Sequence, residues 1–287
     1  MSSHPAVLFL VSADTGCVQV DPEDPHVFVT DLGVTRGDGI FETISVCNGR
    51  PQALEPHLAR FARSARLLDL PEPDLALYRR AVLAAIEAHD DVPELFVKTV
   101  MTRGIEGTGV ATGWAYATEA GDFAAARTAG IRVVTLDRGL RHDVAQTSPW
   151  LLQGAKTLSY AVNRAALREA SRRDADDVIF TSSDGFVLEG PTANVILRLG
   201  DRLVTPRTDQ GILAGTTQAS VFEFAESIGL QTEYAVLPVA ALAEADALWL
   251  VSSVRQAAPV NSLDGISRQV DGELTRRMTE FLLGRTE

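Results

Sequence analysis

The chain is poor in lysine and cysteine and has no long apolar run. Only two of its 26 basic residues are lysines, Lys98 and Lys156, so arginine carries almost all of the positive charge. Two cysteines, Cys17 and Cys47, are too few for a disulfide framework, and no metal-ligand spacing links them to the five histidines. No apolar run approaches the ~20 residues of a membrane-spanning helix. We therefore expect no disulfide scaffold, no metal centre and no membrane partner.

The chain also has fewer basic than acidic residues, 26 against 38. The formal net charge of −12 argues against nucleic acid or an anionic membrane surface as a partner. A small anionic substrate stays open, because a local arginine cluster can override the global sign. The N-terminus lacks a basic region followed by an apolar core and a cleavage site, so we expect a cytoplasmic protein. No strand precedes a Gly-x-Gly-x-x-Gly motif, which disfavours a Rossmann-type oxidoreductase.

The composition itself, with 46% hydrophobic and 22% charged residues, is that of a soluble globular protein. A chain of 287 residues can form one large or two medium domains. The small, polar stretch 118–130 is typical of an interdomain connection, and a strand is expected directly after it. We predict one domain at 1–120, a linker at 121–130 and a second domain at 131–287.

Lys156 stands out because this chain otherwise places its positive charge on arginine. Arginine keeps its proton near neutral pH and forms no imine, whereas a lysine amine in an apolar setting can do both. Lys156 is therefore a candidate for amine chemistry, with an ordinary surface lysine as the alternative. Glu189 follows after a helix and a turn signal at 183–185. A carboxylate in that position can keep a pyridinium nitrogen protonated, as pyridoxal phosphate (PLP) enzymes require.

This pair and its surroundings resemble the fold-type IV PLP enzymes, the class IV aminotransferase family. The family includes branched-chain aminotransferases, D-amino acid aminotransferases and 4-amino-4-deoxychorismate lyases, and the resemblance runs from about Gly33 to Val260. It implies an α/β (α+β) fold with a small α/β N-terminal domain and a larger C-terminal domain with a barrel-like sheet. It also implies PLP in the cleft between the domains, and a homodimer whose second subunit helps to close the site.

The resemblance assigns cofactor contacts across the chain. Lys156 would attach PLP covalently and act as the base, and Glu189 would contact the ring nitrogen. A forked guanidinium suits a phosphate dianion, and the His57-x-x-Arg60 pattern assigns that role to Arg60. The remaining implied cofactor residues are Tyr160, Asn194, Leu213, Gly215, Thr216, Thr217 and Ser253. Without the resemblance, a solvated basic edge, a core tyrosine and a plain helix cap would explain Arg60, Tyr160 and the threonine pair.

Three basic residues are candidates for binding a small anionic, amino-acid-like substrate: Arg36, Lys98 and Arg255. Lys98 interrupts an apolar strand, so its side chain must point at water, a carboxylate or a site. Aminodeoxychorismate lyases carry a lysine at this place. Arg36 stands where relatives often have an aromatic residue, and a surface arginine explains it equally well.

The same strand separates the two leading functions. D-amino acid aminotransferases favour an Arg-x-His motif just after the Arg-Gly that ends this strand, but here 105–107 read Ile-Glu-Gly. We therefore expect a lyase that converts 4-amino-4-deoxychorismate to 4-aminobenzoate and pyruvate. A D-amino acid aminotransferase or another class IV aminotransferase is the alternative, and a non-catalytic PLP-fold protein is a remote one. A branched-chain aminotransferase is disfavoured because three basic residues suit aliphatic side chains poorly.

Overall fold

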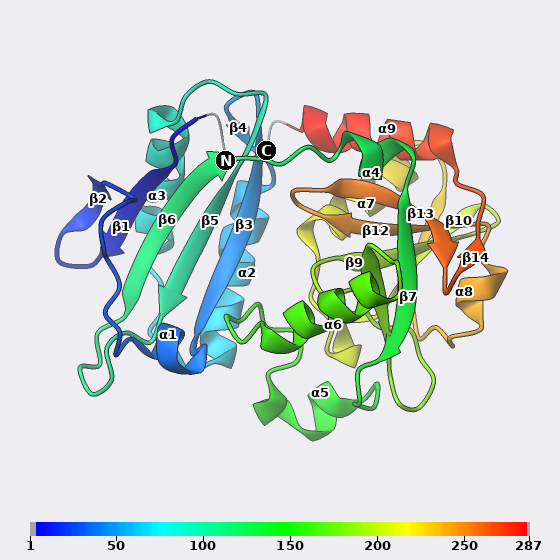
Figure 1. Cartoon of the computed structure of the whole chain (residues 1–287), viewed down its shortest axis with the longest axis horizontal. Helices are drawn as coiled ribbons and strands as arrows, with labels where there is room; N and C mark the ends of the chain where they lie inside the picture. The colour runs from blue at the N-terminus through cyan, green and yellow to red at the C-terminus, as the bar shows by residue number, and fades with distance from the viewer. Residues whose placement is uncertain (1–3, 286–287) are drawn as a thin grey trace. The chain divides into compact units, whose positions relative to one another are not determined.

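The computed structural model describes residues 4–285, which form two compact units (Figure 1). The first unit contains residues 4–121, the short segment 155–160 and Arg285. The second contains residues 122–154 and 161–284. Lys156 thus belongs to the first unit, although the residues before 155 and after 160 belong to the second. The domain boundaries expected at 120 and 131 stay a prediction.

The first unit is a six-stranded antiparallel sheet in the order β2-β1-β6-β5-β3-β4. Its strands are β1 (Val7–Ser12), β2 (Gly16–Val20), β3 (Gly39–Cys47), β4 (Arg50–Pro51), β5 (Glu94–Thr102) and β6 (Thr112–Glu119). A short helix, α1 (Leu32–Arg36), precedes β3, and the longer helices α2 (Leu54–Leu67) and α3 (Leu75–Ala88) cover one face of the sheet (Figure 1). A two-residue turn at Asn48-Gly49 joins β3 to β4.

The two faces of this sheet differ, as period-two alternation requires. On the face under α2 and α3, Ile40 and Ile44 of β3 and Val97 and Thr99 of β5 are fully buried. Residues of the opposite face remain partly accessible, among them Phe41, Phe96, Trp114 and Tyr116, with Lys98 exposed. The first unit therefore has one covered face and one open face.

The second unit is a curled, half-barrel sheet of eight strands in the order β11-β10-β9-β12-β13-β7-β8, with β14 paired to β13. Its strands are β7 (Ile131–Asp137), β8 (Asp177–Thr181), β9 (Asn194–Leu199), β10 (Arg202–Pro206), β11 (Gln231–Ala235), β12 (Ala247–Ser252), β13 (Gln256–Leu263) and β14 (Ile266–Ser267). Parallel pairs, β10 with β11, β13 with β7 and β7 with β8, occur beside antiparallel ones. This mixed α/β architecture confirms the expected fold class.

Helices surround this sheet and define its separate cores. They are α4 (Ala124–Thr128), α5 (Val144–Thr147), α6 (Ala161–Arg172), α7 (Thr216–Ser227), α8 (Ala241–Glu244) and α9 (Gly272–Gly284), with short 3-10 turns at Pro149–Leu151 (η1) and Thr208–Gln210 (η2). α6 packs its alanines on β7 and β8, and α7 and α9 share a core with Trp249 and Met278. Among residues 4–285, no helix is long and apolar enough to cross a membrane.

Candidate active site

Lys156 lies on a short segment that pairs with the free edge of β3. The Phe41 N–H donates to the Lys156 carbonyl (3.1 Å), and the Leu158 N–H donates to the Gly39 carbonyl (2.8 Å). These bonds flank an antiparallel bridge between Ile40 and Thr157. Only glycine fits at position 39, because a Cβ there would lie 2.7 Å from the Met101 carbonyl oxygen and from a Leu158 methyl group. The sheet thus fixes the backbone at the lysine.

The Lys156 side chain is half-buried and contacts an aromatic ring. Its Nζ lies 4.4 Å from the centroid of the Phe41 ring, a distance at which the ring face attracts an ammonium group. Tyr160 meets the same ring edge-on, with the two centroids 5.4 Å apart. The structure therefore brings together two of the residues predicted for the site, Lys156 and Tyr160, around the ring of Phe41.

Beneath Phe41, the covered face of the sheet holds a charged cluster of Glu42, His57 and Arg60. Arg60 Nε and Nη2 donate to the two Glu42 carboxylate oxygens, each at 2.7 Å, and His57 Nδ1 lies 2.7 Å from Glu42 Oε2. All three side chains are buried. The interpretation of His57 and Arg60 as a solvated basic edge is therefore wrong, since β3 supplies a buried carboxylate that local sequence patterns do not reveal.

Burial and charge oppose each other in this cluster. Burial alone would raise the pKa of Glu42, but the Arg60 charge and hydrogen bonds, together with His57, hold that pKa well below its usual range. The pKa of His57 is lowered, first by burial and then by the neighbouring charges of Arg60 and Lys156, against the opposing effect of Glu42. At neutral pH the cluster thus consists of a carboxylate, a guanidinium and a neutral imidazole.

Lys98 is exposed on the open face of the first unit. It pairs with Thr43 of β3 and Tyr116 of β6, so its side chain shares the face of Phe41, two residues along β3 from Thr43. Diagonal neighbours on such a face have Cβ atoms roughly 7–8 Å apart. The sheet therefore directs both lysines of the chain toward the Phe41 region.

Arg36, the other substrate candidate in the first unit, ends α1 and is exposed. Its Nη1 donates to the carbonyl of the preceding residue, Thr35. The adjoining Gly37 carbonyl accepts a hydrogen bond from Ser159 Oγ (3.1 Å), so the end of α1 is tied to the lysine segment. Arg36 is thus near that segment in the fold, and its role in substrate binding stays a prediction.

In the second unit, Glu189 and Leu213 are joined directly. The Leu213 N–H donates to Glu189 Oε2 (3.0 Å), and Asn194 Nδ2 donates to the Leu213 carbonyl (2.8 Å). Arg138 Nη1 lies 3.6 Å from Glu189 Oε1, a contact that no sequence motif announces. These bonds fix the carboxylate of Glu189, which is 14% exposed and so accessible to a bound group.

Next to this cluster, α7 begins with Thr216 after Gly215. A Cβ at position 215 would lie 1.8 Å from Asn194 Oδ1, so any larger residue there would displace the Asn194 side chain from its place beside Leu213. The first turn of a helix presents unpaired N–H groups and the positive end of its dipole, which together suit an anion. Thr216 and Thr217 add two hydroxyl groups at this turn.

Arg255 and Ser253 lie at the turn between β12 and β13. Arg255 Nη2 donates to Asp177 Oδ2 (2.5 Å), and Asp177 at the start of β8 is only 1% exposed. Arg255 is therefore already paired with a buried carboxylate, a partner 78 residues away that its sequence context does not indicate. Ser253 is half-buried, and its carbonyl accepts a hydrogen bond from Gln256 Nε2.

The donors present in the two units match the chemical requirements of PLP. The first unit offers a half-buried primary amine and a buried guanidinium, and the second offers a fixed carboxylate and a helix N-terminus with two hydroxyl groups. An aldehyde needs a primary amine, which the first unit provides, while a pyridinium nitrogen needs a carboxylate and a phosphate suits a helix N-terminus, both of which the second unit provides. The residues present therefore fit this cofactor.

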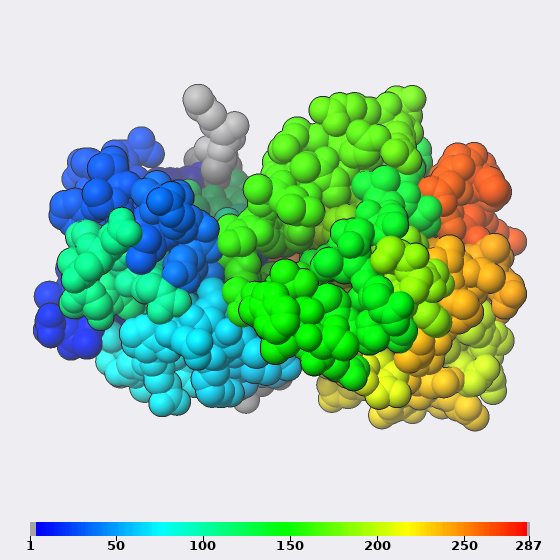
Figure 2. All heavy atoms as spheres, turned by 90° about the horizontal axis from the view of Figure 1, so that it is seen from below, coloured from blue at the N-terminus to red at the C-terminus, as the bar shows by residue number. Residues whose placement is uncertain are grey.

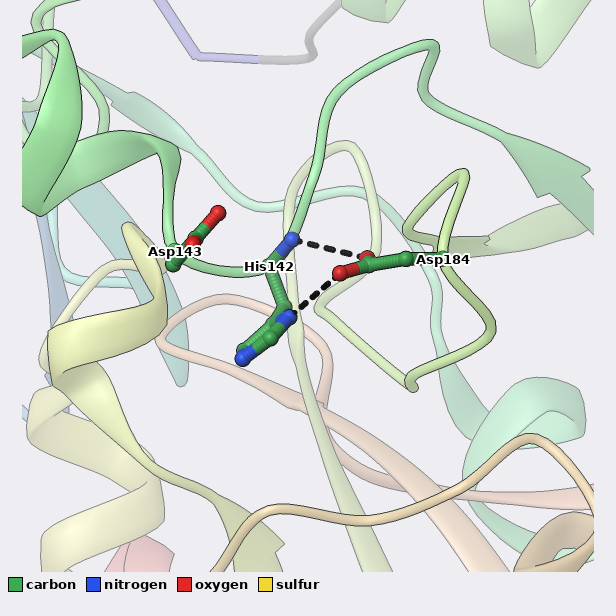
Figure 3. A group of neighbouring side chains, drawn as sticks. All are labelled: His142, Asp143 and Asp184. Atoms are coloured by element: carbon green, nitrogen blue, oxygen red, sulfur yellow. Dashed lines mark hydrogen bonds and ion pairs between the residues drawn. The ribbon is translucent and has the colours of Figure 1, made fainter.

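A second polar group, His142, Asp143 and Asp184, lies in the second unit (Figure 3). Its possible ligand atoms lie within 4.8 Å of one another, but His142 already hydrogen-bonds Asp184 through Nδ1 (2.6 Å) and through its backbone N–H (3.0 Å). Arg141 pairs with both carboxylates, at 3.1 and 3.7 Å. We assign no metal to this group, because its side chains already pair with one another or with Arg141. The contacts between His142 and Asp184 join the segment 138–143 to the turn after β8, and we call them the His142–Asp184 clasp.

Comparisons with known proteins agree with this geometry. The family model for amino-transferase class IV matches residues 39–263. The chain is 44% identical over 256 residues to a bifunctional aminodeoxychorismate lyase / D-amino acid transaminase of Mycobacterium tuberculosis, covering 86% of this chain and 89% of that protein.

Solved structures agree as well. The fold IV-transaminase CpuTA1 of Curtobacterium pusillum is 58% identical, with a TM-score of 0.96 over 98% of both chains. A hypothetical aminotransferase of M. tuberculosis in PLP-bound form is 40% identical, with a TM-score of 0.88 over 96% of this chain and 97% of that one. The matched region spans Phe41, Lys156 and Glu189, and the chain belongs to the class IV aminotransferases, PLP-dependent enzymes of fold type IV.

Proposed function

We propose that this enzyme is an aminodeoxychorismate lyase that releases 4-aminobenzoate and pyruvate from 4-amino-4-deoxychorismate. The observation that carries the proposal is the position of Lys98, an exposed cation on the sheet face that also bears Phe41, the ring in contact with Lys156. A substrate with carboxylate groups gains from such a cation, whereas an aliphatic side chain does not. The Ile-Glu-Gly sequence at 105–107, in place of the Arg-x-His motif, further favours a lyase.

When bound, PLP supplies an electron sink that stabilises the negative charge formed next to the substrate amine. Lys156 would hold the cofactor through its amine until the substrate amine takes its place, and the amine released in this exchange would then take the proton from the carbon that bears the substrate nitrogen. Glu189, whose carboxylate accepts a hydrogen bond from the Leu213 N–H, would keep a proton on the ring nitrogen. Loss of pyruvate then leaves an aromatic ring, which provides a strong driving force.

Four residues are our candidates for contacts to the cofactor phosphate. We propose that Arg60, Thr216, Thr217 and Ser253 bind this phosphate, with Asn194 and Gly215 shaping the turn before α7. Glu42 fixes the plane of the Arg60 guanidinium through two hydrogen bonds. Leu213 would pack on the ring, and Tyr160 would reach its phenolic oxygen. The basic residues Arg36, Lys98 and Arg255 remain the proposed contacts for substrate carboxylates.

A D-amino acid transaminase is the second candidate, and the M. tuberculosis relative favours it because its name includes both activities. Both reactions begin with the same proton removal by Lys156. They diverge afterwards, since the transaminase returns the proton at the cofactor carbon and releases a keto acid.

We also propose that the enzyme is a homodimer. Exposed apolar side chains gather on two adjoining segments of the first unit, where Leu32 N–H donates to the Gly104 carbonyl and Glu106 N–H donates to the Thr30 carbonyl. Phe28 and Val29 are 68% and 83% exposed, and Val34 and Val110 are 63% and 65% exposed. An apolar patch of this kind commonly marks a protein interface. The cytoplasmic location expected from the sequence stays a prediction.

The experiment that tests the lyase function compares the wild-type enzyme with Lys98→Met. Wild-type protein loaded with PLP should release 4-aminobenzoate and pyruvate from aminodeoxychorismate without a keto-acid acceptor, and borohydride should fix the cofactor to Lys156. Lys98→Met should raise the KM for aminodeoxychorismate roughly 10-fold, the effect of losing about 1.4 kcal/mol of charge-assisted binding. The assignment is wrong if turnover appears only with D-alanine and 2-oxoglutarate.

A further inference from the structure

We propose that Ser64 is the positioning residue that sets where the Lys156 side chain leaves the backbone. This inference rests on the proposed function of Lys156 as the amine that attaches PLP. The Ser64 hydroxyl accepts a hydrogen bond from the Lys156 backbone N–H, with an N···O distance of 3.1 Å. Ser64 has no solvent exposure, and it lies 92 residues before its partner in the chain.

The contact matters because of where it falls in the sheet. The lysine segment follows β3 through two hydrogen bonds on either side of the Ile40–Thr157 bridge. If this antiparallel ladder continued, the Lys156 N–H would donate to the Phe41 carbonyl, as the Phe41 N–H does to that of Lys156. The Lys156 N–H donates to Ser64 instead. The ladder therefore ends at the lysine.

The position of Ser64 is itself well determined. It lies one helical turn after Arg60 on the buried face of α2, and Arg60 is fixed to β3 by two hydrogen bonds of 2.7 Å to Glu42. Both backbone polar groups of Lys156 are thus held by elements that are fixed to each other: the carbonyl by β3 and the N–H by α2. A hydroxyl at position 64 therefore sets the backbone orientation at Lys156, and with it the direction from which the amine reaches an aldehyde.

The test uses the full chain and three variants, Ser64→Ala, Ser64→Thr and Thr99→Val. Thr99 is a matched control, because it is also fully buried in the first unit and its hydroxyl has no hydrogen-bond partner. Two quantities are measured: the hydrogen exchange of the Lys156 amide by NMR in cofactor-free protein, and the rate at which added PLP becomes fixable by borohydride at Lys156. Circular dichroism confirms that each variant is folded.

Ser64→Ala should raise the exchange rate of the Lys156 amide roughly 3- to 10-fold, while the Leu158 amide, which donates to Gly39, keeps its rate. The rate of PLP fixation should fall by a similar factor, and Ser64→Thr, which keeps the hydroxyl, should restore both rates. Thr99→Val should match wild type. Unchanged exchange at Lys156 overturns the proposal, and so does faster exchange with an unchanged rate of fixation. Neither measurement uses aminodeoxychorismate, so failure of the lyase assignment would leave this test intact.

Discussion

Glu42 is a buried residue that holds the side chain of Arg60, a proposed phosphate contact, in a fixed orientation. It is completely buried and accepts hydrogen bonds from Arg60 at 2.7 Å on both carboxylate oxygens. Replacing it with glutamine would leave the buried Arg60 charge without its counter-charge. We expect Glu42→Gln to lower the free energy of unfolding by about 3–5 kcal/mol, measured by urea denaturation at pH 7. Glu55→Gln is the control, because its pairing with Arg79 is exposed, and its effect should be below about 1 kcal/mol.

The same cluster predicts how stability depends on pH. The pKa of His57 is lowered by burial from its usual 6.5, so below that pH the unfolded chain binds a proton that the folded chain does not, and stability falls. The pKa of Glu42 is also depressed, so its contribution is present above about 4.5 and is lost as the pH falls further. Urea denaturation should therefore show the difference between wild type and Glu42→Gln narrowing below pH 4.5. A difference that stays constant down to pH 3 would contradict the ionised state of Glu42.

In the second unit, hydrogen bonds connect the segment 138–153 to the strand β8 and the turn after it. This segment contains α5 and η1, lies at the surface (green in Figure 2), and exposes 73% of Trp150. The His142–Asp184 clasp joins it to the turn after β8 (Figure 3). Although desolvation raises the pKa of Asp184, hydrogen bonds from Ser182 and His142 hold it below its usual range, so the clasp has an ionised carboxylate at neutral pH.

Removing that charge should loosen this segment alone. Asp184→Asn should increase hydrogen exchange at the His142 amide several-fold at pH 7, because its N–H donates to an Asp184 carboxylate oxygen. Exchange in α6 should not change. Asp174→Asn, at an exposed aspartate of the same unit, serves as the control. If exchange between residues 138 and 153 were the same in both variants, the clasp would not hold this segment.

At the scale of the whole molecule, the exposed apolar side chains near Phe28 predict association. Phe28→Asp should change the mass in solution from about twice 30.8 kDa to 30.8 kDa, because it places a charge in the proposed interface. Light scattering after size-exclusion chromatography measures the change. Ile266→Asp is a matched control, since Ile266 is 72% exposed but lies on β14 of the second unit. A monomeric wild-type protein would reject the homodimer.

The sequence predicts most elements because their signals are local. Alternation along residues 95–102 predicts β5 and places Lys98 opposite the buried face, and the apolar period after Pro56 predicts α2. Contacts between distant residues leave no such signal. The pairing of Lys156 with β3, the Ser64 hydrogen bond and the Arg255–Asp177 ion pair all join residues more than 70 positions apart. Tertiary packing alone reveals these contacts, so the sequence indicates candidate site residues but not the residues that hold them in place.

The scarcity of lysine has a practical consequence. Isotopic labelling of this one amino acid would give a spectrum with only two backbone signals, from Lys98 within β5 and from Lys156 beside Ser64. One signal comes from the middle of a regular strand and acts as an internal reference, and the other comes from the lysine that we propose to attach the cofactor. Ligands added one at a time can therefore be followed at the reactive position without assigning the rest of the chain.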